Sequence, residues 1–329
     1  MKKIALAVLA AALASNARAQ GVTVKLGTMA PQGSTWHELL KEMAQRWDEA
    51  SGGQVKLRIY PGGAQGSEGD MVRKMGINQL QAASISNIGM HDVIPEPTMF
   101  SVPLLFDDDQ QLDCAFEKVR PTIEAALERR GLVALQWSRV GAVHMFCTAS
   151  RPTPATMKGA KIWAWEGDPK SVESMRTVGL NPVVLSSTDT YASLQTGMID
   201  CVPNVPLYIL TTRLFEKAHY MTSVAWSYVV GATIVRKDAW EKIAPDLRPK
   251  LLAIARELGE RVDAEVKKLN ADAVSAMEKQ GLTVVPGEVA TWRPTLEKTY
   301  PVLRGGNVPA PFFDQVIAAR DACTKAAKR

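Results

Sequence analysis

The chain has 329 residues, of which 46% are hydrophobic and 22% are charged, with a formal net charge of +5. This balance is typical of a soluble globular protein of about two domains. Its basic residues are dispersed, with no run of five, which argues against a nucleic-acid-binding surface.

The first nineteen residues have the pattern of a secretory signal peptide. Two lysines precede an apolar run, Ile4–Ala14, and Ala17–Ala19 forms an A-x-A cleavage site. No stretch reaches the roughly eighteen apolar residues of a membrane-spanning helix. We therefore expect cleavage after Ala19 and export in soluble form. The segment holds three of the basic residues, so the chain from Gln20 onward carries a net charge of +2.

Strands and helices alternate in the first half of the remaining chain. We place the first crossing between two lobes near residues 138–146. The elements predicted there are strands at Val22–Thr28, Gln54–Tyr60, Leu80–Ser86, Leu132–Arg139 and Ala142–Thr148, a helix after Ser34, a helix after the glycine-rich loop near Gly66, and a helix at Leu112–Arg130.

The segment Met157–Asn204 repeats a strand–helix pattern. Predicted strands at Ala160–Trp163, Val183–Leu185 and Met198–Val202 alternate with helices that begin at Asp168-Pro169 and at Thr190. Such alternation builds a parallel sheet, whose ligand site lies beyond the carboxyl ends of the strands. Polar and aromatic side chains at these ends therefore face the expected cleft.

The last third contains one long helical pattern, Arg236–Gln280, interrupted by prolines. A helix of about 30 residues would be about 45 Å long, more than one small lobe, so it should contact both. Around it we predict a short helix at Tyr208–Phe215, strands within Tyr220–Val235 and at Leu282–Pro286, and helices from Val289 and Pro311.

Neither cysteines nor histidines show the spacing of a metal or redox site. Cys114, Cys147, Cys201 and Cys323 lack C-x-x-C spacing, so they are either buried free thiols or form one disulfide, in a pairing that the sequence leaves open. Nucleophile-elbow, zinc-protease and dinucleotide motifs are absent from the sequence. We expect no catalytic residue, no metal and no cofactor.

Several motifs in the segment Met157–Asn204 resemble the second-lobe signature of the substrate-binding proteins of TRAP (tripartite ATP-independent periplasmic) transporters. The glycine-rich Pro61–Gly66 segment and Pro103–Phe106 resemble first-lobe motifs of the same family. Two positions differ from the pattern of this family: Trp163 replaces the arginine that binds a ligand carboxylate, and Cys201 replaces a glycine. The matching second-lobe residues are Lys158-Gly159, Lys161-Ile162, Pro182, Tyr191, Leu194-Gln195, Gly197, Asp200 and Asn204.

The resemblance implies a two-lobed α/β binding protein, with interleaved lobes, a hinge and a long helix packed on both. It implies a monomeric, non-enzymatic periplasmic receptor that delivers a small organic solute to TRAP membrane permease subunits. A ligand sensor that presents its closed form to a membrane-bound kinase is the alternative. The expected division is residues 20–140 for the first lobe, 141–212 for the second, 213–255 for a return to the first, and 256–329 for the end of the long helix and the rest of the second.

We expect the ligand to contact Trp163 and Asn204. Asn204 matches the family's hinge asparagine, and two indoles at positions i and i+2 of one strand point to the same side. Further candidates come from strand ends or from positions close to family contact residues; for several of them a structural role is the alternative. They are Trp165, Glu166, His144, Ser187, Tyr191, Ser86, Asn87, Met29 and Tyr228.

Trp163 changes the ligand that we expect. An indole offers one N–H donor and a flat apolar face, and it cannot replace the two-pronged carboxylate contact of an arginine. The hypothesis is therefore an aromatic, extended apolar or uncharged ligand with at most one carboxylate, unless Arg139 or Arg151 turns inward.

Overall fold

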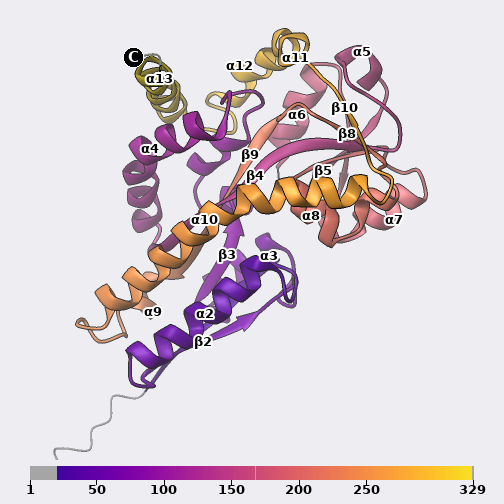
Figure 1. The fold of residues 1–329 in the computed structure, drawn as a ribbon. Coiled ribbons are helices and arrows are strands. Elements are labelled where there is room, and N and C mark those ends of the chain that lie inside the picture. The colour runs from indigo at the N-terminus through magenta and orange to yellow at the C-terminus, as the bar shows by residue number, and fades with distance from the viewer. Residues whose placement is uncertain (1–20, 167, 328–329) are drawn as a thin grey trace, which may run out of the picture.

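The computed structural model describes residues 21–166 and 168–327 of the chain. No helix within these two ranges is both long and apolar enough to cross a membrane. The predicted signal peptide, residues 1–19, lies outside the described residues. The fold is a two-lobed α/β arrangement, as the sequence predicts (Figure 1).

One path of hydrogen-bonded strands runs through both lobes, in the order β2-β1-β3-β9-β4-β7-β5-β6. We call the part built on β2, β1, β3 and β9 the first lobe and the part built on β7, β5 and β6 the second lobe; β4 belongs to both. The strands are β1 Val22–Thr28, β2 Val55–Tyr60, β3 Ala82–Ser86, β4 Leu132–Cys147, β5 Lys161–Trp165, β6 Asn181–Leu185, β7 Cys201–Asn204, β8 Tyr220–Thr222, β9 Ser227–Arg236 and β10 Thr283–Val285.

Helices cover both faces of the first-lobe sheet. One face packs against α2 and α10, and the other against α3, α4 and α13. In the second lobe, α7 and α8 contribute to a separate apolar core. The longer helices are α2 Thr35–Ala50, α3 Glu68–Gly76, α4 Asp109–Arg129, α6 Pro169–Thr177, α7 Thr190–Gln195, α8 Pro206–Thr211, α10 Arg248–Glu278, α11 Val289–Leu296 and α13 Ala310–Ala327.

Local sequence signals account for where helices begin and how strands pair. Asp168 Oδ1 accepts a hydrogen bond from the Ser171 N–H (2.9 Å) at the start of α6, and Pro169 occupies the first turn. Ser34 caps α2, which buries Trp47 completely. β5 is parallel to β6 and β7, as predicted, so their carboxyl ends meet at one edge of the sheet.

β4 is one strand of sixteen residues, although the sequence predicts two strands joined at Val140-Gly141. It pairs with β9 over Leu132–Val143 and with β7 over His144–Cys147, and so passes from one lobe to the other. The register shifts between Arg139 and Gly141, where Gly141 has φ +135°. A bulge bends a strand without ending it, so the glycine marks the passage between lobes and not a turn.

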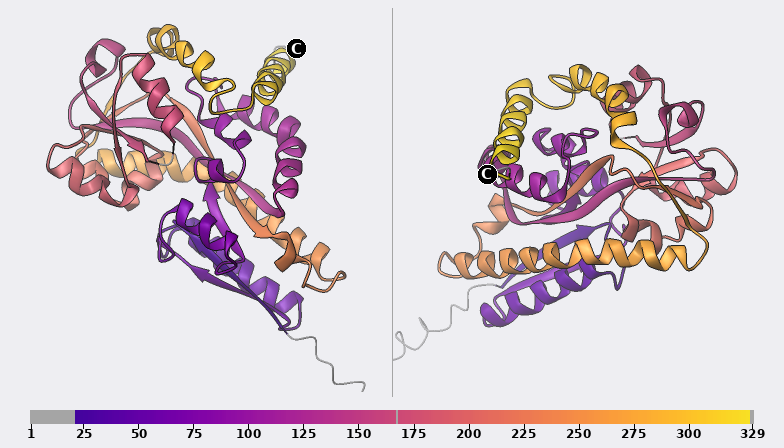
Figure 2. Two further views of the ribbon diagram at one scale, coloured as in Figure 1. Left: turned by 180° about the vertical axis from the view of Figure 1, so that it is seen from behind. Right: turned by 45° about the horizontal axis from the view of Figure 1, so that its top comes forward.

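The long helix α10 lies along both lobes, as predicted: it packs against α2 and β4 and, further along, against α8 (Figure 2). Asn270 joins three elements, because its Nδ2 donates to the Val140 carbonyl (3.0 Å) and its Oδ1 accepts from the Leu207 N–H (3.0 Å). Two turns earlier, the Asp263 carboxylate accepts from the Arg139 N–H. The bulge of β4 is therefore held by side chains of α10.

Two disulfides use all four cysteines, so the alternative of buried free thiols is wrong. Cys147–Cys201 joins β4 to β7, and Cys114–Cys323 joins α4 to α13. The first fixes the pairing of strands that lead to Asn204, since Cys147↔Cys201 and His144↔Asn204 belong to one register. The second holds the last helix against the first lobe.

Two of the expected lobe boundaries differ from the observed pairing. β8 pairs with β10 and with the end of β4 in the second lobe, so the chain returns to the first lobe at Ser227 and not at residue 213. The last helix, α13, packs against α4 and not on the second lobe. Both features depend on contacts between distant segments, which local periodicity does not report.

We predict that Gly141→Ala destabilises the protein by about 1–3 kcal/mol, because an alanine at this φ is strained. Its Cβ would also stand 2.6 Å from Asn270 Nδ2. Gly131→Ala is the control: Gly131 also has positive φ (+71°), but its Cβ would meet open space, so its cost should stay near about 1 kcal/mol. Denaturant unfolding of both variants measures the difference. Equal losses would show that the passage of β4 needs no glycine-specific backbone.

Candidate functional site

A cavity of about 330 Å³ lies between the lobes. Its first-lobe wall comes from the loop after β1, the start of α3 and the end of β3. Its second-lobe wall comes from β5, β7 and the start of α8, while β4 and β9 supply residues between them. The carboxyl ends of parallel strands thus converge on the cavity, where a ligand site is expected in such sheets.

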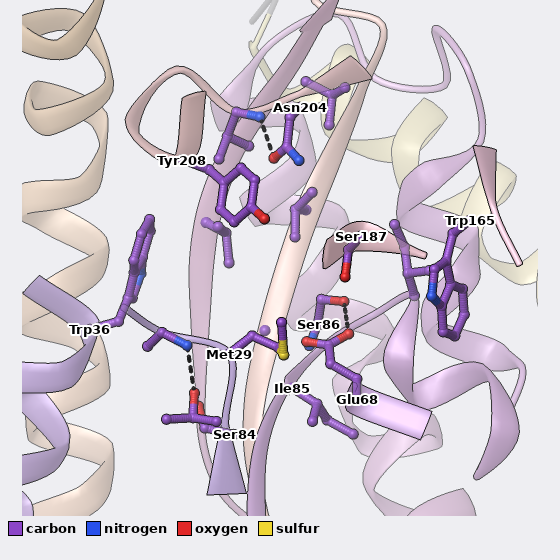
Figure 3. Close-up of a pocket in the computed structure, with 18 of the residues that line it drawn as sticks. Met29, Trp36, Glu68, Ser84, Ile85, Ser86, Trp165, Ser187, Asn204 and Tyr208 are labelled. Atoms are coloured by element: carbon purple, nitrogen blue, oxygen red, sulfur yellow. Dashed lines mark hydrogen bonds between the residues drawn. The ribbon is translucent and has the colours of Figure 1, made fainter. Parts of the chain in front are cut away.

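Trp163 and Trp165 both line the cavity, as their i, i+2 spacing on β5 predicts. The Trp163 Nε1–H is buried and has no hydrogen-bond partner within residues 21–166 and 168–327, and the same holds for Trp36 at the start of α2. Figure 3 shows Trp36 and Trp165 at opposite sides of the view, with the cavity residues between them. A buried indole N–H normally finds an acceptor, but both nitrogens have almost no accessible surface, so a ligand can reach them only if neighbouring groups move.

Asn204 and Ser187 contribute polar groups from the second lobe. Asn204 Oδ1 accepts from the Val205 N–H (2.8 Å), which fixes the amide plane. Its Nδ2 takes no part in that bond and remains available as a donor to a ligand. Ser187 begins the short helix Ser187–Asp189 that follows β6.

Met29 and Ser86 line the cavity from the first lobe, together with Glu68, which the sequence analysis did not single out. Glu68 accepts from the Ser86 N–H (2.8 Å) and from the Ser86 Oγ–H (2.6 Å), as Figure 3 shows. Burial raises the pKa of the Glu68 carboxyl, although the hydrogen bonds from Ser86 oppose that shift. A Cβ on Gly89 would stand 2.2 Å from this carboxylate, so the backbone passes close to it.

Three predicted residues, Asn87, His144 and Tyr228, are not among the residues that line the cavity. Asn87 accepts from the Val230 N–H and donates to Ser101 Oγ, so its amide ties β9 to the loop after β3. His144 Nδ1 faces the Thr222 carbonyl at 3.1 Å, and burial lowers the pKa of the imidazole. Tyr228 packs edge-on against Phe106.

Two predicted residues, Glu166 and Tyr191, are exposed and lie outside the lining. Tyr191 retains 38% of its surface, because its helix α7 presents this side chain to solvent. Glu166 follows the last residue of β5, beyond the point where the strand faces the cavity. The position of Glu166 at a strand end and the family resemblance of both residues had placed them beside the ligand.

The sequence analysis missed Glu68, Trp36 and Tyr208, all of which line the cavity. Each lies in the first turn of a helix that follows a strand. The rule that ligands bind beyond the carboxyl ends of parallel strands would have found them, had it been extended to the first turn of each following helix in both lobes. Applied to the first lobe as well, the rule points to Glu68 after the loop from β2.

Glu68 is the one charged side chain among the described residues that line the cavity. Hydroxyl groups supply most of the other polar atoms, from Thr28, Ser67, Ser84, Ser86, Ser101, Ser138, Ser187, Tyr208 and Ser227. Within the described ranges, no group of three His, Cys, Asp or Glu residues is placed to hold a metal ion. The cavity therefore offers neutral donors and acceptors, aromatic faces and a single carboxyl group.

This geometry is that of a solute-binding protein with its ligand cavity between two lobes. Residues 26–304 match the model of the bacterial extracellular solute-binding protein family 7, named DctP. The chain belongs to this family, the non-enzymatic substrate-binding proteins of TRAP transporters.

Similar proteins span almost the whole chain. The sialic acid-binding periplasmic protein SiaP of Vibrio cholerae is 21% identical, over 97% of this chain and 99% of its own. The C4-dicarboxylate-binding periplasmic protein DctP of Rhodobacter capsulatus is 25% identical, over 78% of each chain. A TRAP periplasmic solute-binding protein from Xanthobacter autotrophicus, solved with β-D-galacturonate, superimposes with a TM-score of 0.84 at 19% identity, covering 91% of this chain and 99% of that one.

We predict that Asn204→Ala weakens binding of the solute by about 1–3 kcal/mol, because a ligand group would lose its buried hydrogen-bond partner. Calorimetry with a solute identified by a compound screen measures the loss. Asn181→Ala, an exposed change on β6, is the control and should leave affinity unchanged. An Asn204→Ala variant that binds as tightly as the unmodified protein would remove Asn204 from the site.

Proposed function

We propose that this protein is the periplasmic receptor for a small solute that carries hydroxyl groups or an aromatic or extended apolar part and at most one carboxylate. It closes its lobes on the solute and delivers it to the membrane subunits of a TRAP transporter. We further propose that it works as a monomer after export and cleavage behind Ala19. The observation that supports the ligand class is that, among the described residues, Glu68 is the one charged side chain in the cavity lining.

Nearby arginines do not supply the missing cation. Arg139 Nε donates to Asp113 Oδ1 (2.6 Å), and its guanidinium lies 4.1 Å from the centre of the Phe116 ring. Arg151 donates to the Thr156 carbonyl (2.6 Å). Neither side chain lines the cavity. Neither of them therefore takes the place of the carboxylate-binding arginine that the family has at the position of Trp163.

The residues that line the cavity disfavour binding of a compact dianion. Burying an unpaired charge costs several kcal/mol, more than the roughly 1.5–3 kcal/mol that a buried apolar side-chain-sized group contributes. Glu68 would add repulsion whenever it is ionised. A dicarboxylate would therefore surrender its hydration without gaining a fixed positive partner.

A hydroxylated solute with one carboxylate fits the same wall. Hydroxyl groups exchange hydrogen bonds with the serines, and the free Nδ2 of Asn204 serves a carbonyl or hydroxyl oxygen. One carboxylate could accept from the unpaired indole N–H of Trp163 or Trp36 once the lobes move and expose it, and a hydrogen bond to a charged group contributes about 1.5–3 kcal/mol. β-D-Galacturonate, bound by the similar Xanthobacter protein, is chemically of this class.

We predict that hydroxylated monoacids, neutral polyols or aromatic monoacids raise the unfolding temperature, whereas succinate and malate do not. A ligand at 100 times its dissociation constant adds about 2.7 kcal/mol, enough for a clear thermal shift. Trp163→Arg should restore the carboxylate-binding arginine of the family and shift the ligand preference of the protein toward dicarboxylates. Trp163→Phe is the matched control, because it removes the N–H without adding charge and should also remove most of a ligand-induced change in tryptophan fluorescence. Micromolar binding of succinate or malate to the unmodified protein would refute the proposed ligand class.

We also predict that a monoanionic solute binds more tightly as pH falls. The pKa of Glu68 is raised, so lowering the pH protonates this carboxyl and removes its repulsion. Glu68→Gln should bind the anion more tightly at neutral pH and lose this pH dependence, since an amide can keep both contacts with Ser86. Titration calorimetry across pH 5–8 measures this. Identical pH profiles for Glu68→Gln and the unmodified protein would show that Glu68 does not face the ligand.

A further inference from the structure

Four side chains of the second-lobe wall present polar groups that are open to a ligand. Trp165, Ser187, Asn204 and Tyr208 line the cavity between the lobes. Their polar atoms Nε1, Oγ, Nδ2 and Oη make no hydrogen bond to another residue within 21–166 and 168–327. Unlike the indole nitrogen of Trp163, these four atoms also keep accessible surface. They are therefore available to a solute in the structure as it stands.

The ends of three adjacent strands bring three of these residues together. β5 is parallel to β6, with Trp165 opposite Leu185, and Ser187 follows two residues later. On the other side of β5 lies β7, which is also parallel to it and ends at Asn204. Because neighbouring strands lie about 4.8 Å apart, the three residues stand in a row along one edge of the sheet.

Tyr208 extends this row from the first turn of α8. The chain runs from Asn204 directly into this helix, whose start is held where the Leu207 N–H donates to Asn270 Oδ1 (3.0 Å). Figure 3 shows the Tyr208 hydroxyl directed into the space between the labelled residues. Burial raises the pKa of Tyr208, so its hydroxyl keeps its proton and can donate a hydrogen bond at neutral pH.

The open groups of the second lobe are mainly hydrogen-bond donors. The indole N–H of Trp165 and the amide NH₂ of Asn204 can only donate, whereas the two hydroxyls can donate or accept. The amide oxygen of Asn204 is already used, because it accepts from the Val205 N–H (2.8 Å). Neutral donors suffice to keep a carboxylate ionised when it accepts two or three of their hydrogen bonds. This wall therefore suits a group that only accepts, such as a carboxylate.

The first-lobe wall suits an anion less well. Two of its hydroxyls are already used as donors, since Ser86 Oγ donates to Glu68 (2.6 Å) and Ser67 Oγ donates to Asp70 (2.9 Å). The Glu68 carboxylate accepts hydrogen bonds when it is ionised and repels another negative charge. A hydroxyl group can donate to it. The two walls thus favour opposite ends of a hydroxylated acid.

We propose that the solute binds with its carboxylate against the second lobe, where Trp165, Ser187, Asn204 and Tyr208 act as neutral donors, and with its hydroxyl groups toward Glu68. This inference rests on the proposed function, because it starts from a solute with one carboxylate in the cavity between the lobes. It adds the orientation of that solute, and it assigns Trp165 and Tyr208 as residues that determine specificity for an acid.

Two sugars that differ in the carboxylate test this orientation. D-Galacturonate carries a carboxylate where D-galactose carries a CH₂OH group, and calorimetry measures the affinity of the protein for each. The unmodified protein should bind galacturonate about tenfold more tightly, because hydrogen bonds to a charged group are stronger than those to a neutral one. Equal affinities for the two sugars would overturn the proposal.

Two variants remove one donor each and keep an aromatic ring at the site. Trp165→Phe and Tyr208→Phe should each weaken galacturonate about fivefold or more and weaken galactose less, so that the ratio of the two affinities falls. Tyr191→Phe is the matched control for Tyr208→Phe, because Tyr191 is exposed and lies outside the lining. It should leave both affinities unchanged. A general folding defect would lower both affinities and leave their ratio as it is.

Failure of the orientation and failure of the proposed function give different results. If the ratio of affinities changed in neither variant, the orientation would be wrong, but the proposed function would stand because the sugars still bind. If neither sugar bound at millimolar concentration, the orientation would again be wrong. The thermal-shift comparison of monoacids and polyols with succinate and malate would then decide the proposed function separately.

Discussion

A charged group that leaves water needs a partner of opposite sign, and this constraint determines what the cavity between the lobes can hold. The wall offers indole faces, hydroxyls, one amide and one carboxyl group, and Glu68 carries its only charge among the described lining residues. Arg139 and Arg151, the two arginines considered as substitutes for a cation at Trp163, are bonded to Asp113 and to the Thr156 carbonyl. Every part of the proposed ligand class follows from this balance.

The fold brings the residues that line the cavity together because one strand, β4, runs through both lobes. β4 bends at its bulge, and Asn270 and Asp263 of α10 hold the bulge. Cys147–Cys201 fixes the register that places Asn204 opposite His144. Any rotation of one lobe against the other therefore has to bend β4, which is paired with strands of both lobes.

The sequence predicts much of this arrangement because its signals are local. Asp168-Pro169 starts α6, the repeated strand–helix pattern gives the parallel pairing of β5 with β6 and β7, and the i, i+2 indoles on β5 both line the cavity. Contacts between distant segments carry no such signal. The continuous β4, the pairing of Cys114 with Cys323 and the position of α13 depend on them, and the expected carboxylate at Glu166 proved exposed while Glu68 lines the cavity.

The most direct measurement is the identity of the solute that the protein retains when it is purified from periplasm. Native mass spectrometry, followed by release of the ligand under denaturing conditions, gives its mass and composition. A hydroxylated or aromatic molecule with no more than one carboxylate would agree with a wall that lacks a fixed cation. A stoichiometric compact dicarboxylate would contradict it, because such a ligand requires a cationic partner in the closed cavity.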